Sequence, residues 1–287
     1  MKHEETYWLT EDGVNLLART WEPEELGKGV ICLVHGLGEH SGRYGHWADL
    51  LTGAGYVTLS FDLRGHGLSD GRRGDTPSFD RYADDITIMI EKARNRYPGK
   101  PIFIYGHSLG GLLVLYYLVQ RHPQLKGAVV TSPGLRTMIN EQKGKVLAAQ
   151  ILGSLIPRVS IANGLDLNGL SRDRSIVEAY KQDSFVHDRI SLHAGKEMLK
   201  AISCVFEKAS SIDLPLLIMH GTADHITYAA GSKELAALLP SRCTLKLWDG
   251  YFHELHNEPD KEQVFTFLQE WLEDRLKENS ESPGGNN

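Results

Sequence analysis

The sequence predicts an α/β fold, in which a mostly parallel sheet carries helices on both faces. Two observations predict this class. Patterns typical of strands and of helices alternate along the chain, and such alternation is characteristic of parallel sheets. The chain also has 287 residues, of which 41% are hydrophobic, so it can bury a large core, and α/β folds of this size are often one domain.

The predicted elements follow one another in a regular order. An opening hairpin is expected over 7–10 and 14–21, with its turn at Glu11-Asp12-Gly13. Strand patterns then occupy 30–34, 56–61, 102–105 and 128–131, and helix patterns occupy 46–52, 79–97 and 109–121. Two further strands are predicted over 214–219 and 244–247, and a helix is predicted to start near Glu258-Pro259.

The alternation is interrupted once. It stops near Pro133 and resumes near Leu214, and the segment between them is helical and loop-like without a strand pattern. We therefore predict a core formed by residues 1–133 and 212–279, and a cap over 134–211 that is inserted above the strand ends. The polar residues 280–287 are predicted to be a disordered tail.

The stretch from Pro101 to Gly111 predicts a nucleophilic serine. The apolar strand runs directly into Gly106-His107-Ser108-Leu109-Gly110-Gly111, and a helical pattern follows. A serine is exposed at a strand end only in a very tight turn, and glycines at 106 and 110 remove the Cβ atoms that would clash there. The G-x-S-x-G string alone occurs in about a tenth of chains this long. Its place between a strand and a helix is what the nucleophile elbow of an α/β-hydrolase requires.

An acid and a histidine follow the serine in the order of an α/β-hydrolase. Asp224 comes after the strand over 214–219, where open parallel sheets place their sites. The loop after 128–131 offers no carboxylate, so Asp224 is the candidate that orients the histidine. Asp62 also ends a strand, but it precedes the nucleophile, and we expect it to form a structural ion pair with an arginine.

Two histidines follow the last strand. His253 is nearer to the strand end and follows a turn that contains glycine, whereas His256 lies where a helix is about to begin. We therefore favour His253 as the catalytic base, with His256 as the alternative. The other histidines at strand ends are expected to be structural, with His35 and His220 bonded to loop backbone and His107 turned into the core.

The oxyanion hole is expected to use two backbone amides. One is the amide of Leu109, which follows the nucleophile directly. The other is expected from the loop His35-Gly36-Leu37-Gly38 after the strand over 30–34, where the glycines let the backbone approach closely. We predict that Leu37 donates this second amide.

Charge and composition argue against several classes of protein. The net charge of −6 and the pI of about 6.1 give no basic surface for a nucleic acid. Residues 1–5 lead into polar sequence without an apolar signal region, and no apolar run reaches the roughly 18 residues of a spanning helix. We therefore expect a cytoplasmic protein.

The cysteines and glycines predict neither a metal nor a cofactor. Cys32, Cys204 and Cys243 cannot all pair and lack metal-ligand spacing, so we interpret them as small buried hydrophobic residues in a reducing compartment. The sequence contains no zinc motif, Walker loop or dinucleotide fingerprint.

Five motifs together resemble the monoacylglycerol lipase and lysophospholipase group of α/β-hydrolases: His35 to Tyr44, Phe61 to Gly67, Gly106 to Gly111, His220 to Asp224 and His253 to His256. The match is collinear from about Trp8 to Trp271. The resemblance implies a serine hydrolase that cleaves monoacylglycerols to fatty acid and glycerol through an acyl-enzyme. A lysophospholipase or a general carboxylesterase is the alternative, and a non-catalytic binding module is a remote one.

The resemblance also implies residues that contact the substrate. It places Glu39, Arg43 and His256 near the alcohol end of the substrate, and it brings Tyr180 in from the cap. Asp183-Ser184-Phe185-Val186 departs from the group, which more often has proline after the aspartate. This departure leaves the shape of the cap near the acyl pocket open.

An apolar stretch within the cap is compatible with two arrangements. Residues 146–157 carry few charges, and they form either a helix packed on the core or a lid that exposes apolar surface. In the second case the lid would touch a membrane or micelle from which substrate is drawn. The stretch is too short to span a bilayer, so any such contact is expected to be superficial and transient.

Overall fold

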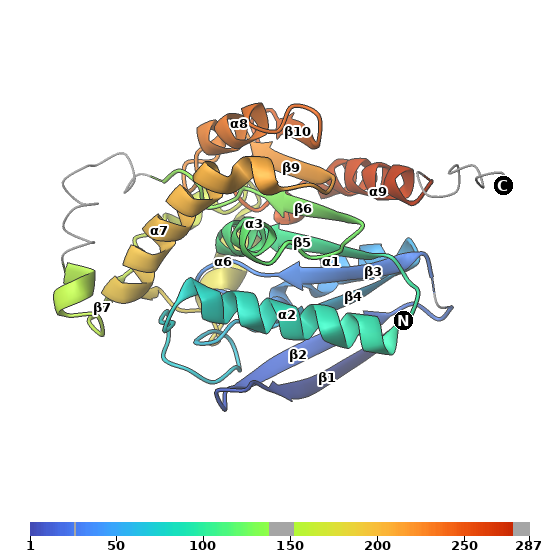
Figure 1. The fold of residues 1–287 in the computed structure, drawn as a ribbon. Coiled ribbons are helices and arrows are strands. Elements are labelled where there is room, and N and C mark those ends of the chain that lie inside the picture. Colours follow the sequence, from blue (N-terminus) through green and yellow to red (C-terminus); the bar gives the residue numbers. More distant parts are fainter. Residues whose placement is uncertain (26, 138–151, 278–287) are drawn as a thin grey trace.

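The computed structural model describes residues 1–25, 27–137 and 152–277 (Figure 1). Eight strands form its central sheet: β1 (Lys2–Leu9), β2 (Asn15–Glu22), β3 (Gly29–Val34), β4 (Tyr56–Phe61), β5 (Ile102–His107), β6 (Gly127–Thr131), β9 (Leu216–Gly221) and β10 (Cys243–Trp248). Their order across the sheet is β1-β2-β4-β3-β5-β6-β9-β10. Only the β1–β2 and β2–β4 pairs are antiparallel, so the sheet is mostly parallel, as predicted.

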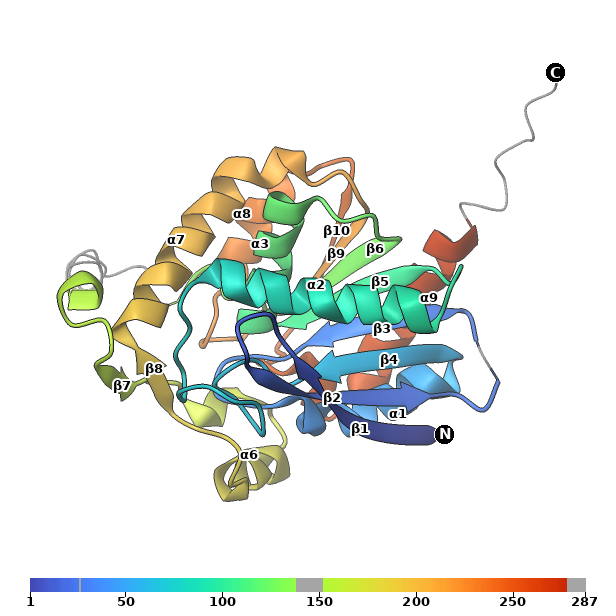
Figure 2. The same cartoon turned by 60° about the horizontal axis from the view of Figure 1, so that its bottom comes forward.

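Helices cover both faces of this sheet (Figures 1 and 2). They are α1 (Gly45–Gly53), α2 (Phe79–Arg96), α3 (Leu109–Arg121), α8 (Ala229–Ala237) and α9 (Lys261–Lys277). Buried side chains of α2, α3 and α8 belong to one apolar cluster, and those of α1 and α9 belong to another. Alternate residues of β5 divide between the two clusters, with Ile102 and Ile104 in the first and Phe103 and Tyr105 in the second. This is the two-residue period of a strand that is buried on both faces.

The inserted segment between β6 and β9 is defined here as residues 134–211. Its described elements are β7 (Ser160–Ala162), η2 (Leu167–Gly169), α6 (Arg174–Gln182), β8 (Arg189–Ser191), α7 (Leu192–Lys208) and η3 (Ala209–Ser211). β7 and β8 pair antiparallel, so the expectation of a segment without strands is wrong. Each strand has three residues, which is too few to display a period of two. The apolar residues 146–151 and the tail 280–287 lie outside the described residues.

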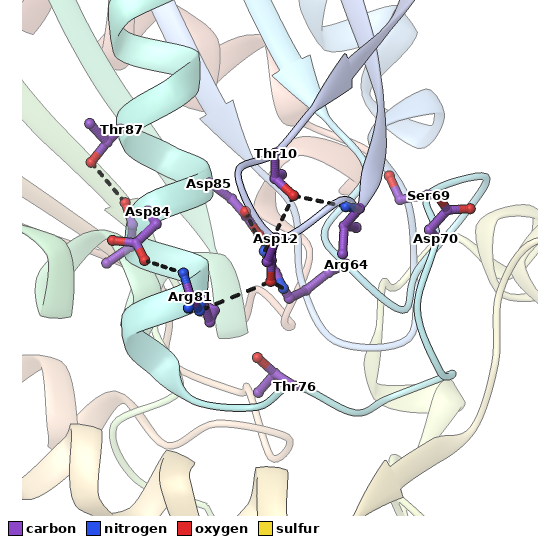
Figure 3. A network of polar contacts seen from close by, with 12 residues as sticks. Thr10, Asp12, Arg64, Ser69, Asp70, Thr76, Arg81, Asp84, Asp85 and Thr87 are labelled. Atoms are coloured by element: carbon purple, nitrogen blue, oxygen red, sulfur yellow. Dashed lines mark hydrogen bonds and ion pairs between the residues drawn. The ribbon is translucent and has the colours of Figure 1, made fainter.

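Two buried arginines fix the loop that follows β4. Asp62 Oδ1 accepts hydrogen bonds from Arg19 Nη1 at 2.8 Å and from the Ser41 amide at 2.9 Å, which is the structural ion pair expected for this aspartate. Arg64 donates from Nε and Nη2 to the two carboxylate oxygens of Asp85 on α2, each at 2.7 Å. Its Nη1 reaches Asp12 in the β1–β2 turn at 2.9 Å (Figure 3). The loop is therefore tied to the hairpin and to α2.

The burial of the cysteines differs in part from what the sequence predicts. Cys32 is buried, as expected, but Cys204 and Cys243 are only partly buried, and all three are free thiols. Across the described ranges, no helix is both long and apolar enough to cross a bilayer.

Candidate active site

The turn between β5 and α3 presents Ser108. Its backbone has φ 54° and ψ −117°, and it stands directly before the first residue of α3. Ser108 is partly exposed, whereas its neighbours on both sides are buried. A Cβ on Gly106 would lie 2.4 Å from the Gly110 carbonyl oxygen, and one on Gly110 would lie 2.1 Å from that of Val34. The turn therefore needs both glycines, as the sequence predicts.

Asp224 and His253 meet at the carboxyl edge of the sheet. Asp224 follows β9 and His253 follows β10, and Asp224 Oδ2 lies 2.7 Å from His253 Nδ1. The other oxygen of this carboxylate, Oδ1, accepts the amides of Ile226 at 2.8 Å and Thr227 at 3.0 Å. Because Nδ1 of His253 faces a carboxylate, its Nε2 is the nitrogen that remains to exchange a proton.

In this pair, burial and the neighbouring opposite charge shift each pKa in opposite directions. Burial raises the pKa of the Asp224 carboxyl, but His253 and His220 beside it outweigh burial, and the pKa lies well below its ordinary value. Burial lowers the pKa of His253, but the Asp224 carboxylate outweighs it, and the pKa is raised above 6.5. Asp224 is therefore ionised throughout the neutral range, and His253 is a stronger base than a free histidine.

The His253 loop contacts the ends of both β6 and β5. Ser132, which follows β6, donates from Oγ to the His253 carbonyl oxygen at 2.8 Å. The rings of His253 and His107, the residue before Ser108, have centroids 4.7 Å apart. The amide of Ser108 donates to the Thr131 carbonyl oxygen at 3.0 Å. Three strand ends thus converge around the serine.

The loop after β3 passes beside the serine. A Cβ on Gly36 would lie 3.2 Å from Ser108 Cβ, so the backbone approaches as closely as the sequence predicts. Gly38 has φ 77°, and its carbonyl oxygen accepts the His187 amide of the inserted segment at 2.8 Å. Leu37 and Leu109 line one small apolar cavity together. Their amides therefore belong to segments that meet beside Ser108, and their role in an oxyanion hole stays a prediction.

Three of the four residues assigned to the alcohol end lie together. Glu39 Oε2 accepts a hydrogen bond from Arg43 Nη1 at 2.5 Å, and the Arg43 guanidinium lies 4.6 Å from the ring centroid of Tyr180. Glu39 Oε1 also accepts the Gly36 amide at 2.6 Å and the Tyr44 hydroxyl at 2.7 Å. Burial raises the pKa of Glu39, but Arg43 outweighs it and holds the pKa at about 2.

His256 lies deeper than these three residues. Its ring is fully buried and stacks on Tyr44, with centroids 4.6 Å apart and an interplanar angle of 20°. Among the described residues, neither of its ring nitrogens has a hydrogen-bond partner. Burial lowers the pKa of His256 well below its ordinary value, so the ring is neutral. Its contact with substrate stays a prediction.

The site also includes residues that the sequence analysis did not assign to it. Thr227 Oγ1 lies 3.0 Å from Asp224 Oδ2 and 3.2 Å from His253 Nδ1, and His220 Nε2 lies 3.1 Å from the same Asp224 oxygen. The only sequence signal that these two residues lie near the aspartate is their spacing, since Thr227 comes three residues after Asp224 and His220 four residues before it. Glu254 binds Arg43 through two hydrogen bonds of 2.7 and 2.8 Å, and no local pattern indicates this pair.

The serine turn, the aspartate–histidine pair and the parallel sheet that carries them define a serine hydrolase with the α/β-hydrolase fold. Comparisons with known proteins narrow this class. Residues 27–260 match the family described as serine aminopeptidase, S33, and the chain belongs to this family. The predicted fold is confirmed by solved structures, described below.

Similar sequences include named lipases. The chain is 31% identical to a monoacylglycerol lipase of Mycolicibacterium smegmatis over 92% of its length and 95% of that protein. It is 32% identical to the human monoglyceride lipase, over 93% of this chain and 89% of that protein. It is also 39% identical, over 97% of its length, to an uncharacterized abhydrolase domain-containing protein of Dictyostelium discoideum, but spans only 30% of that longer protein.

Similar solved structures carry related names. The crystal structure of the Paleococcus ferrophilus monoacylglycerol lipase is 37% identical and has a TM-score of 0.83, over 91% of this chain and 99% of that one. A soluble variant of the Saccharomyces cerevisiae monoglyceride lipase, solved with a substrate analogue, is 26% identical with a TM-score of 0.86, over 95% of both chains. The family and these relatives identify a carboxylic ester hydrolase, in agreement with the resemblance seen in the sequence.

Proposed function

We propose that the protein hydrolyses monoacylglycerols to a fatty acid and glycerol, with Ser108, His253 and Asp224 as its catalytic triad. The relatives support monoacylglycerol hydrolysis by a serine hydrolase. One observation carries the proposal for this chain. The loop that passes beside Ser108 is bonded through its Gly36 amide to Glu39 of a buried polar cluster, and this polar surrounding suits the hydroxyl-bearing end of a monoacylglycerol.

The proposed reaction passes through an acyl-enzyme. Ser108 Oγ attacks the ester carbonyl carbon while His253 Nε2 takes the hydroxyl proton. The amides of Leu37 and Leu109 stabilise the oxyanion, and the His253 imidazolium then protonates the leaving glycerol oxygen. Water repeats the sequence and releases the fatty acid. Asp224 holds the imidazole in the required tautomer throughout.

The polar and apolar sides of the site are built by different residues. The polar cluster consists of Glu39, Arg43, Glu254 and Tyr180. The apolar cavity next to the two proposed oxyanion residues is lined by Leu37, Leu109, Phe79, Tyr82, Ile190 and Met198. We infer that the hydroxyl-bearing end faces the cluster and that the acyl chain lies against these apolar side chains. Hydroxyl groups can donate to the carboxylates without adding a charge.

The charge of the polar cluster distinguishes monoacylglycerols from lysophospholipids. One relative, from Bacillus subtilis, is named a phospholipase and is 30% identical over 86% of this chain, so a lysophospholipid is the second candidate. In the cluster, however, one guanidinium faces two carboxylates, Glu39 and Glu254. A phosphate group would meet a surrounding that is negative overall. We therefore favour the uncharged glycerol end.

We further propose that the inserted segment is the cap over this site and touches the surface of aggregated lipid. Leu155 is 72% exposed, and other large apolar side chains near it are exposed as well: Leu152, Ile156, Val159 and Ile161. An apolar surface of this kind favours shallow contact with a membrane or micelle. The cytoplasmic location of the protein stays a prediction from the sequence.

Substrate choice is tested by comparing lipid esters in equal dispersions. We expect hydrolysis of a monoacylglycerol to exceed that of a triacylglycerol by at least roughly tenfold, which needs about 1.4 kcal/mol of discrimination. The two extra chains of a triacylglycerol would leave buried polar groups unpaired, at about 1 to 3 kcal/mol each. Released fatty acid is measured by titration. Equal rates on the two lipids would indicate a general lipase instead, and faster cleavage of lysophosphatidylcholine would favour a lysophospholipase.

The pH dependence of the reaction tests the proposed base. His253 must be neutral to accept the serine proton, so activity is expected to fall as the pH is lowered through its pKa. Because the pKa of His253 is raised, we expect the midpoint of this fall in kcat/KM to lie above pH 6.5. The measurement uses a p-nitrophenyl ester, which itself carries no titratable group. A midpoint clearly below 6.5 would contradict the assignment.

A further inference from the structure

A buried guanidinium joins two loops of the proposed site. Arg43 donates from Nη1 to Glu39 Oε2 at 2.5 Å, and from Nη1 and Nη2 to the two oxygens of Glu254 at 2.7 and 2.8 Å. The side chains of Arg43, Glu39 and Glu254 are 10%, 4% and 2% exposed. Tyr180 of the inserted segment covers the guanidinium. Charge-assisted hydrogen bonds that are shielded from water in this way are strong and directional.

Each carboxylate of this cluster continues into one functional loop. Glu39 accepts the amide of Gly36, the residue before the proposed oxyanion donor Leu37. Glu254 follows His253 in the chain, and its Oε2 also accepts the Asn257 side-chain amide at 2.7 Å. A continuous path of hydrogen bonds thus runs from the oxyanion loop through Arg43 to the loop of the base. A shift of either loop would break a bond of a buried charge, which is costly.

The same cluster sets the charge around His253. The groups that face His253 come from four places: Asp224 with Thr227 after β9, His107 at the end of β5, Glu39 with Arg43 after β3, and Glu254 with His256 in its own loop. The two other histidines are neutral, because burial lowers the pKa of His107 to about 3 and that of His256 well below its ordinary value. Three carboxylates and one guanidinium therefore remain as fixed charges near the base. Removing the Glu254 charge would leave two carboxylates.

We propose that Glu254 is a positioning residue, which joins the loop of the base to the oxyanion loop through Arg43, and that its negative charge favours the imidazolium formed on His253 during acylation. The proposal rests on the proposed role of His253 as the base. It adds to that role a residue outside the triad that controls both the geometry and the proton affinity of the base. In this scheme Glu254 touches neither the reacting ester bond nor the serine, and its place in the polar cluster concerns only the glycerol end of the substrate.

The test separates the charge of Glu254 from its reach. Glu254→Gln keeps the length of the side chain but removes the charge, so the acidic midpoint of kcat/KM is expected to fall by roughly half a unit to one unit. Glu254→Asp keeps the charge but is one methylene too short to hold Arg43. This variant is expected to retain the midpoint and to lose kcat by roughly ten- to a hundred-fold, because the two loops are no longer held together. A p-nitrophenyl ester serves as substrate, so binding of a glycerol group does not enter.

The matched control is Asp85→Asn, which also removes one carboxylate from a buried arginine pair and lies on α2, a helix that carries none of the groups named above as facing His253. It is expected to lower thermal stability without moving the midpoint. An unchanged midpoint in Glu254→Gln, or wild-type kcat in Glu254→Asp, would overturn the proposal, and if Glu254→Gln does not fold, the aspartate variant alone decides. Wild-type labelling by a fluorophosphonate is measured in parallel. If the wild type neither labels nor turns over, the proposed function fails as a whole, whereas an active wild type with unaltered variants refutes only the role of Glu254.

Discussion

Replacing Ser108 with alanine is expected to lower kcat by something like a million-fold, the size of effect seen when a triad serine is removed elsewhere. Ser108 supplies the oxygen that attacks the ester, and no neighbouring hydroxyl is held in its position on the turn. The oxyanion amides and the binding surfaces remain, so a small residual rate above that of water is expected. Turnover of a monoacylglycerol and of a p-nitrophenyl ester measures the loss.

Two controls show whether the Ser108→Ala variant loses activity for lack of the nucleophile or for lack of a folded structure. Alanine retains the Cβ atom of serine, so Ser108→Ala should melt at nearly the wild-type temperature in circular dichroism, and loss of fold would not explain the loss of rate. A fluorophosphonate that labels the wild type should leave the variant unlabelled. If the variant kept more than a small fraction of wild-type turnover, Ser108 would not be the nucleophile.

The two histidines after β10 are expected to differ sharply when each is replaced. His253→Ala should lower turnover about as far as the loss of Ser108 and should abolish fluorophosphonate labelling, because the serine then lacks its base. His256→Ala should retain labelling and most cleavage of a p-nitrophenyl ester, since the His256 ring contacts Tyr44 and His107 rather than Asp224. Turnover and labelling of the purified variants distinguish these outcomes.

The buried position of His256 requires a control for packing. Removal of a fully buried ring leaves a cavity, so His256→Ala should melt at a lower temperature than the wild type. Both variants are therefore compared well below their melting temperatures. The reverse pattern, in which His256→Ala loses labelling and His253→Ala keeps it, would transfer the role of the base to His256.

The regular part of the fold could be predicted because its signals are local. The helix over 109–121 and the strand over 56–61 have the bounds that their sequence patterns predict, since the apolar run of each is visible in the sequence. The paired strands β7 and β8 were not predicted, because three residues show no period and their pairing depends on a contact across the inserted segment. Local patterns therefore define long elements better than short ones.

The site divides in a similar way. Ser108, Asp224 and His253 each follow a strand and could be placed from the sequence, because parallel strands end at one edge of the sheet. Glu254 could not, since its partner Arg43 is 211 residues away in the chain. The burial of the His256 ring could not be predicted either. A motif shows that two histidines are close in sequence, but it does not show the direction in which each ring points. Long-range pairing and side-chain direction appear only in three dimensions.

The backbone of Ser108 bears on the stability of the protein as well as on its chemistry. A φ of 54° in a residue with a Cβ atom costs on the order of 1 to 3 kcal/mol of folding free energy. The whole net stability of a domain is only about 5 to 15 kcal/mol. Glycine would relieve this strain but carries no nucleophile, so selection for stability and selection for turnover act in opposite directions at this one position. Interactions elsewhere in the fold must therefore contribute the folding free energy that offsets this backbone strain.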